Sequence, residues 1–219
     1  MSTAREVILQ RIQAALRDVP PDAPGDDVAI QRDYRLRDEA PQDEIVERLV
    51  ERLVEYKALV RRVTEEQLRG AIAEALGARG VQRLVIPADL PTEWLPDDVT
   101  PLRDSAELTN EELDTSDGVL TGCLLAIAQT GTIVLDHGAL QGRRALTLLP
   151  DYHLCIVREE QIVGLVPEAM AAMESAARAG RPITLISGPS ATSDIELNRV
   201  EGVHGPRTLE VLIVASRIE

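Results

Sequence analysis

The sequence predicts an α/β fold, in which helices cover both faces of a mostly parallel β-sheet to give three layers. Short, continuous apolar runs alternate with helix-like segments, which is typical of buried parallel strands joined by helices. The length of 219 residues suffices for one sizeable hydrophobic core. The expected strands are residues 83–87, 118–123, 132–136, 153–157, 183–186 and 209–214.

An N-terminal helical extension precedes this domain. Residues 3–17 carry apolar side chains at helical spacing, and a longer apolar stripe predicts a second helix over residues 45–60. Between them, residues 18–41 are rich in Pro, Asp and Gly and predict a mobile linker. We therefore assign residues 1–60 to the extension and linker, and residues 61–219 to the α/β domain.

A capping box marks the start of the next helix. Thr64 is followed three residues later by Gln67, and Gly77 and Gly80 end the apolar periodicity beyond it. Residues 88–117 contain ten acidic residues and one basic residue, so we expect solvated surface there.

Composition excludes several classes of function. The net charge of −14 disfavours both a nucleic-acid-binding surface and docking on an anionic membrane. No apolar run approaches the roughly 20 residues of a membrane span, and the N-terminus lacks a signal-peptide core. We therefore expect a cytoplasmic protein without nucleic-acid or membrane partners.

The two cysteines, Cys123 and Cys155, are 32 residues apart and form no CxxC motif. Such a pair cannot supply an iron–sulfur or zinc–thiolate site, so we expect no metal and no cofactor in this chain. The simplest interpretation is two buried cysteines that act as small apolar residues.

Three polar, glycine-rich loops are candidate ligand sites, because open α/β sheets bind ligands where strands end. The first loop joins a predicted helical turn at residues 124–129 to the strand at 132–136. In it, Gly131 permits close backbone approach, and the hydroxyls of Thr130 and Thr132 can donate to an anion. A helix C-cap at Gly131 remains an alternative.

The second loop follows the strand at 183–186. Its candidate residues are Ser187, Gly188, Ser190, Thr192 and Asp194. Glycine favours a turn, and the hydroxyl residues can cap a helix whose amides attract an anion. The carboxylate of Asp194 can orient a basic group or simply cap the helix.

The third loop contains His204 and Gly205 and leads into the last strand. His204 titrates near neutral pH, so it suits either proton transfer or a structural hydrogen bond. Arg143 and Arg144 offer guanidinium groups for a carboxylate or phosphate, or else pair with surface acids. The three histidines are scattered and form no metal signature. No Walker loop, GxGxxG fingerprint or GxSxG elbow is present.

At these loops the sequence closely resembles the lactate utilization protein C family (the LUD domain). The resemblance is carried by three long strings in order, DGVLTGCLLAIAQTGTIVLDHG, QGRRALTLLPDYHLCIV and ISGPSATSDIELNRVEGVHGPRTLEVLIV. It is dense over residues 117–219 and looser in the N-terminal part.

The resemblance implies a Rossmann-like, three-layer sheet of the ribose-5-phosphate isomerase and CoA-transferase type. It also implies a role in oxidising L-lactate to pyruvate with two partner proteins, one of them an iron–sulfur protein that would carry the redox centres. Gln129 stands where the family commonly has an acidic residue, so an acyl-transfer mechanism through that position is not expected.

Two functions remain open from the sequence. In the first, the chain is a subunit of an L-lactate utilization system that binds a small anionic ligand or its partner subunits. The alternative is a stand-alone enzyme that acts on a phosphorylated or CoA-linked small molecule. A homo-oligomer is compatible with either function.

Overall fold

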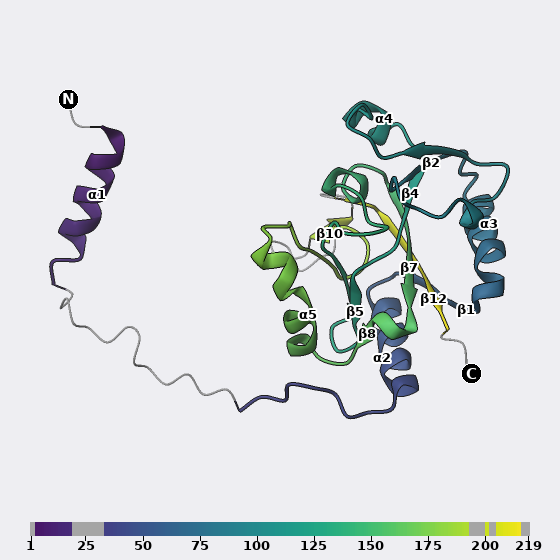
Figure 1. The fold of residues 1–219 in the computed structure, drawn as a ribbon, viewed down its shortest axis with the longest axis horizontal. Coiled ribbons are helices and arrows are strands. Elements are labelled where there is room, and N and C mark those ends of the chain that lie inside the picture. The colour runs from purple at the N-terminus through teal and green to yellow at the C-terminus, as the bar shows by residue number, and fades with distance from the viewer. Residues whose placement is uncertain (1–2, 19–32, 193–199, 202–204, 216–219) are drawn as a thin grey trace. The chain divides into compact units, whose positions relative to one another are not determined.

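The structure is a computed structural model of the chain, and it describes residues 3–18, 33–192, 200–201 and 205–215 (Figure 1). The chain forms two compact units, Met1–Tyr34 and Arg35–Glu219. Most of the expected linker, residues 19–32, lies outside the described residues. The helix expected over residues 45–60 lies within the second unit together with the strands.

A six-stranded parallel sheet forms the centre of the second unit, as the sequence predicts. Its strands, in spatial order, are β1 (Leu59–Val63), β12 (Thr208–Val214), β7 (Tyr152–Arg158), β4 (Gly118–Thr121), β2 (Arg83–Ile86) and β3 (Thr100–Arg103). β7 and β12 pair along seven residues, from Thr208 opposite Tyr152 to Val214 opposite Arg158. Both strands are almost entirely buried, which explains their continuous apolar sequences.

A second, four-stranded sheet packs against the first and was not foreseen. It consists of β8 (Ile162–Val163), β5 (Leu125–Ile127), β6 (Thr132–Leu135) and β9 (Thr184–Ile186). The expected helical turn at residues 124–129 was wrong, because Leu125–Ile127 forms a strand antiparallel to β6. Ala126 packs into the core beside the large sheet, whereas Leu125 and Ile127 face the opposite side, as strand alternation requires.

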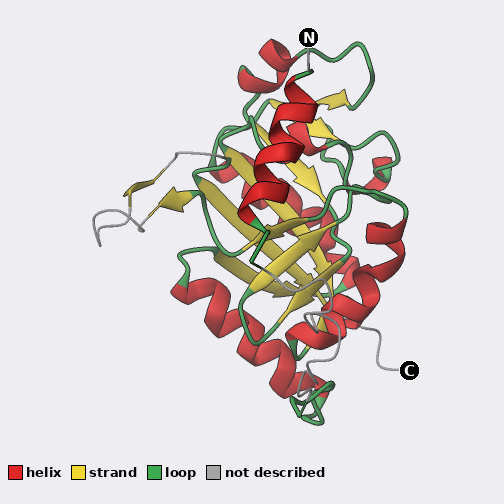
Figure 2. Ribbon diagram, turned by 90° about the vertical axis from the view of Figure 1, so that its left-hand side faces the viewer, coloured by secondary structure: helices red, strands yellow, loops and turns green. Residues whose placement is uncertain are grey.

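Helices complete the layers on either side of the strands (Figure 2). α3 (Leu68–Ala78) packs on one face of the large sheet. α2 (Gln42–Glu55) packs on the other face, beside the small sheet, and α5 (Val166–Arg178) covers the outer face of the small sheet. The expected Rossmann-like α/β architecture is confirmed.

Two helix boundaries show how local signals compete. The Thr64–Gln67 capping box forms and leads through a 3₁₀ turn (Glu65–Gln67) into α3. The helix expected to run to residue 60 ends earlier, since Lys57 adopts a positive φ of 70° and the chain turns into β1. Val60 therefore lies in a strand.

The acidic segment is less solvated than expected. It contains β3 and two short helical pieces, Thr92–Trp94 and α4 (Asn110–Asp114). Trp94, Leu108 and Leu113 from this segment are buried. The segment thus combines exposed acidic side chains with apolar side chains that are buried in the core.

In the first unit, α1 (Ala4–Ala15) begins at a capping box formed by Thr3 and Glu6. No residue of α1 is buried, and its apolar side chains Ile8, Leu9 and Ile12 are about half exposed. Among the described residues, none of the helices has both the length and the apolar character needed to cross a membrane.

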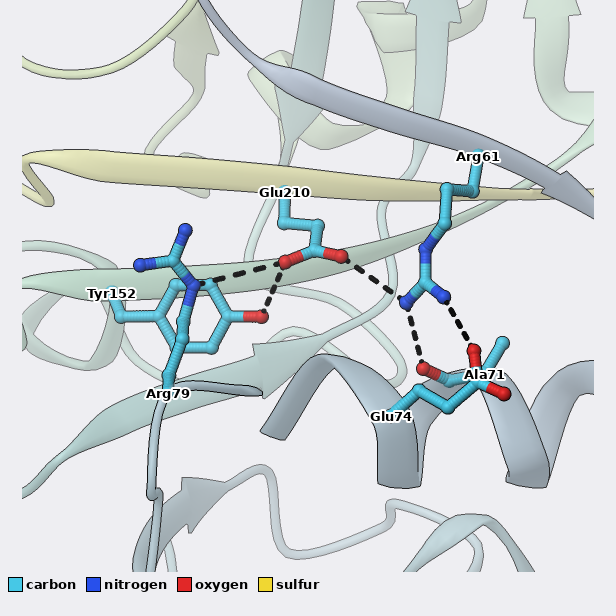
Figure 3. Close-up of polar contacts among 6 residues, drawn as sticks. All are labelled: Arg61, Ala71, Glu74, Arg79, Tyr152 and Glu210. Carbon is cyan, nitrogen blue, oxygen red and sulfur yellow. Dashed lines mark hydrogen bonds and ion pairs between the residues drawn. The ribbon is translucent and has the colours of Figure 1, made fainter. Parts of the chain in front are cut away.

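A polar network on the α3 side ties three strands together (Figure 3). The Glu210 carboxylate accepts hydrogen bonds from Arg61 at 3.2 Å and from the Tyr152 hydroxyl at 3.0 Å, and Arg79 lies 3.8 Å from it. The Arg79 guanidinium also stacks over the Tyr152 ring, 4.6 Å from its centroid. Only 8% of the Glu210 side chain is exposed, so these partners compensate for a buried charge.

We expect Glu210→Ala to lower the free energy of unfolding by about 2 kcal/mol. The substitution removes the acceptor of the Tyr152 hydroxyl and the carboxylate beside Arg79, whereas Arg61 keeps Glu74 and the Ala71 carbonyl. Urea denaturation measures this change. Glu174→Ala is the control, because Glu174 pairs with Arg178 at the exposed surface of α5, and its loss should change stability by less than about 0.5 kcal/mol. Equal effects of the two substitutions would contradict the structural role of Glu210.

Alkaline pH provides a second test of this network. Burial, together with the nearby Glu210 charge, raises the pKa of Tyr152 above its ordinary value. The folded state therefore favours the neutral phenol. Above about pH 10 the tyrosine of the unfolded chain ionises first, so stability falls as pH rises. Tyr152→Phe should make the decline in urea midpoint above pH 10 shallower than in the wild type, and an unchanged slope would refute this assignment.

Candidate functional site

A cavity of about 540 Å³ lies between the two sheets. Its walls are β9, the following segment 187–191, the Gly205–Pro206 turn before β12, Arg144 and Thr147 of a 3₁₀ turn, and the side chains of His153 and Leu209. The cavity is within the size range of sites for small molecules and cofactors.

The cavity lies at the amino ends of β7 and β12, where His153 and Leu209 face each other across the sheet. Among the strands that line the cavity, only β9 has its carboxyl end there. The large sheet therefore does not follow the general rule that ligands bind at the carboxyl ends of parallel strands. The small sheet, absent from the prediction, supplies the opposite wall.

Hydrogen bonds between hydroxyl groups join the first two predicted loops. The Thr132 hydroxyl lies 2.8 Å from that of Thr130 and 2.8 Å from that of Ser187. The Ser190 amide donates to the Pro206 carbonyl at 2.8 Å, which connects the second loop to the turn before β12. The second loop and the turn before β12 thus line one cavity, and the first loop is joined to it through the Thr132–Ser187 contact.

Two glycines serve packing in these loops. Gly188 has a φ of 87°, and a Cβ there would lie 2.7 Å from Tyr56 Cβ, so only glycine fits beneath the end of α2. Gly131 has a φ of 60° in the β5–β6 turn, where a Cβ would clash with Arg52. Gly131 is therefore a hairpin-turn residue that packs against α2, not a helix C-cap.

The structure distinguishes the two neighbouring arginines. Arg143 is held by Asp104, which accepts from its Nε at 2.8 Å and from its backbone amide at 3.1 Å, and it also donates to the Leu108 carbonyl. Arg144 lines the cavity and has no carboxylate partner among the described residues. Burial lowers the pKa of Arg144, yet a guanidinium stays cationic at neutral pH. It is thus the available positive charge of the cavity wall.

His153 is the buried titratable residue of the cavity. Only 1% of it is exposed, and its Nε2 lies 2.8 Å from the Thr121 hydroxyl on the neighbouring strand β4. Its second ring nitrogen, Nδ1, is buried and has no hydrogen-bond partner among the residues that the structure describes. Buried polar atoms are almost always paired, so the unpaired ring nitrogen of a residue that lines a cavity is a candidate contact for a ligand.

Beyond His153 lie the two cysteines, which the fold brings together. Both are free and buried, and the Cys155 thiol lies 3.7 Å from the Gly122 carbonyl. Hydrogen bonding to Cys155 and burial raise the pKa of Cys123 well above its ordinary value. The neighbouring Cys123, together with the nearby side chains of His153 and Thr121, lowers the pKa of Cys155, so the thiolate is favoured at Cys155 rather than at Cys123. Their interpretation as buried residues is confirmed, but their proximity was not foreseen.

The predicted site residues divide into four groups. Five line the cavity: Arg144, Ser187, Gly188, Ser190 and Gly205. Thr130 and Thr132 support Ser187 through hydroxyl contacts, whereas Gly131 and Arg143 are engaged elsewhere. The side chain of Thr192 and the whole of Asp194 and His204 lie outside what the structure describes.

His153 was missed because it sits in an apolar strand rather than in a loop. One signal was present in the sequence: a histidine and a cysteine alternate with apolar residues at 153–157, which places both on one face of a buried strand. Thr121 occupies the corresponding face of β4, opposite Cys155. No group of three or more metal-ligating side chains occurs among the residues that the structure describes.

Comparison with known proteins identifies similar sequences. The profile of the LUD domain matches residues 46–214. The chain is 53% identical to Lactate utilization protein C of Deinococcus radiodurans over 171 residues, which are 78% of this chain and 80% of that protein. It is 28% identical to Lactate utilization protein C of Geobacillus kaustophilus over 172 residues, covering 70% of this chain and 71% of that protein.

A solved structure shows the same architecture. The crystal structure of a DUF162 family protein from Deinococcus radiodurans matches with a TM-score of 0.70 and 45% sequence identity. The match covers 80% of this chain and 99% of that one.

The two arginines provide a matched test of the cavity. Arg144→Gln should weaken the binding of inorganic phosphate by about tenfold, because a charge-assisted contact is lost. Arg143→Gln should leave phosphate binding unchanged and lower stability instead, since it releases Asp104 and the Leu108 carbonyl. Thermal-shift titration with phosphate measures both effects. Equal loss of binding in the two variants would place the anion elsewhere.

Proposed function

Because the chain belongs to the LUD domain family, we propose that it is a subunit of an L-lactate utilization system that oxidises L-lactate to pyruvate. In this proposal the chain binds a small anionic ligand in the cavity between the sheets and docks with partner subunits. The main support for this proposal is the 53% identity to a Lactate utilization protein C over about four fifths of both chains.

The chemistry of the cavity supports anion binding. Arg144 supplies a cation, and Thr147, Thr184 and the second loop supply hydroxyl groups and backbone amides. No Asp or Glu is among the described residues that line the cavity. In a protein with a net charge of −14, a cavity whose described lining has an arginine and no carboxylate favours a negatively charged ligand.

The redox centres of the system are assigned to a partner. An iron–sulfur cluster usually takes four cysteine ligands, and this chain has two cysteines in its whole sequence. We therefore propose that an iron–sulfur protein encoded in the same gene cluster carries the electrons, and that this chain carries the ligand. A homo-oligomer is compatible with this division.

The proposal predicts a stable complex and a growth defect. The full chain should co-purify with the neighbouring iron–sulfur protein. Deletion of the gene that encodes this chain should abolish growth on L-lactate as sole carbon source. Complementation with the wild-type gene or with Arg143→Gln should restore growth, whereas Arg144→Gln should restore it poorly, because it removes the cation of the cavity.

Normal growth of the deletion strain on L-lactate, together with no complex, would refute the proposal. The stand-alone enzyme on a phosphorylated or CoA-linked substrate would then become the leading function.

A further inference from the structure

We infer that the cavity binds a hydroxylated organic anion larger than lactate, whose hydroxyl group contacts His153 Nδ1 and whose anionic group contacts Arg144. The inference rests on the proposed function only in taking the ligand to be an anion. It adds the chemical class of the ligand, its size and a binding residue on β7.

The hydrogen-bonding state of His153 determines what the ligand must offer. Nε2 contacts the Thr121 hydroxyl at 2.8 Å, and Nδ1 is buried with no partner in the described part of the chain. If the Thr121 hydroxyl donates to Nε2, then Nδ1 carries the proton and needs an acceptor; if Nε2 donates, Nδ1 needs a donor. A hydroxyl group can donate and accept, so it satisfies Nδ1 in either tautomer.

The position of His153 is fixed by the sheet. Strand β7 lies between β12 and β4, and Val119 and Leu209 are the paired neighbours of His153. Thr121 holds the ring from the adjacent strand. Thr121 is thus a positioning residue, and the unpaired nitrogen is preorganised for a ligand.

The size of the cavity argues against lactate as its sole occupant. Lactate has six non-hydrogen atoms, which at no more than about 30 Å³ each would fill less than about 180 Å³. The cavity measures about 540 Å³ and includes the apolar side chains of Leu185, Ile186 and Leu209. A ligand with a longer body fills this space, and longer hydroxy carboxylates and sugar phosphates share the required chemistry.

Isothermal titration calorimetry on the full chain tests the inference with two matched probe pairs. The first pair is 2-hydroxyhexanoate and hexanoate, and the second is glucose 6-phosphate and hexyl phosphate. The hydroxylated member of at least one pair should bind about tenfold more tightly than its partner, because only it satisfies Nδ1. The pair that discriminates identifies the source of the anion, a carboxylate or a phosphate.

Two substitutions of His153 separate its two nitrogens. His153→Gln retains an amide near the position of Nε2 and loses the group at Nδ1, so it should abolish the preference for the hydroxylated probe. His153→Asn retains a polar atom near Nδ1 and should keep part of the preference. Arg144→Gln should weaken both members of a pair equally.

If the His153 variants fail to fold, Thr121→Val provides an independent test. It removes the hydroxyl that orients the ring and should reduce the preference, and Thr121→Ser should restore it. A structural role alone would lower the melting temperature without changing the ratio of the two affinities.

The inference is overturned if no hydroxylated probe binds, if neither pair discriminates, or if His153→Gln retains the full preference. Its failure is distinguishable from failure of the proposed function. If the chain forms a complex with the iron–sulfur partner and is needed for growth on L-lactate, but binds both probes of each pair equally, only the proposed ligand class is refuted. Discrimination without complex or growth defect would refute only the lactate role.

Discussion

The register between β7 and β12 is the constraint on which the rest of the structure depends. It places Tyr152 opposite Thr208 and His153 opposite Leu209, so successive side chains point to opposite faces of the sheet. Tyr152 and Glu210 then meet at the α3 side, and His153 and Leu209 meet at the cavity. A slip by one residue would exchange the two environments and bury Glu210 beside the cavity.

The two faces of the large sheet carry buried polar groups in different arrangements. On the α3 side, a buried carboxylate is compensated by two arginines and a tyrosine hydroxyl, which stabilises the order of three strands. On the cavity side, one nitrogen of His153 contacts Thr121, and the other has no partner within the described ranges of the chain. In the first arrangement the buried carboxylate finds its partners within the chain, whereas in the second we propose that a ligand provides the partner of Nδ1.

Local patterns predicted much of the fold and part of the site. Apolar runs gave the central parallel strands, and the Thr64–Gln67 capping box gave the start of α3, because these signals act within a few residues. The small sheet was not predicted, since Leu125–Ile127 becomes a strand only by pairing with Thr132–Leu135 and Ile162–Val163. The loops supplied Arg144 and Ser187, whereas the unpaired Nδ1 of His153 becomes visible only once tertiary packing has buried the strand.

The central claim is that ligand occupies the cavity and contacts His153 directly. Nitrogen-15 NMR of the imidazole side chains, recorded while 2-hydroxyhexanoate or glucose 6-phosphate is added, tests it most directly. We expect the Nδ1 resonance of His153 to shift until the protein is saturated and ligand protons to show Overhauser contacts to the same ring. Binding that leaves the His153 resonances unchanged would contradict the account.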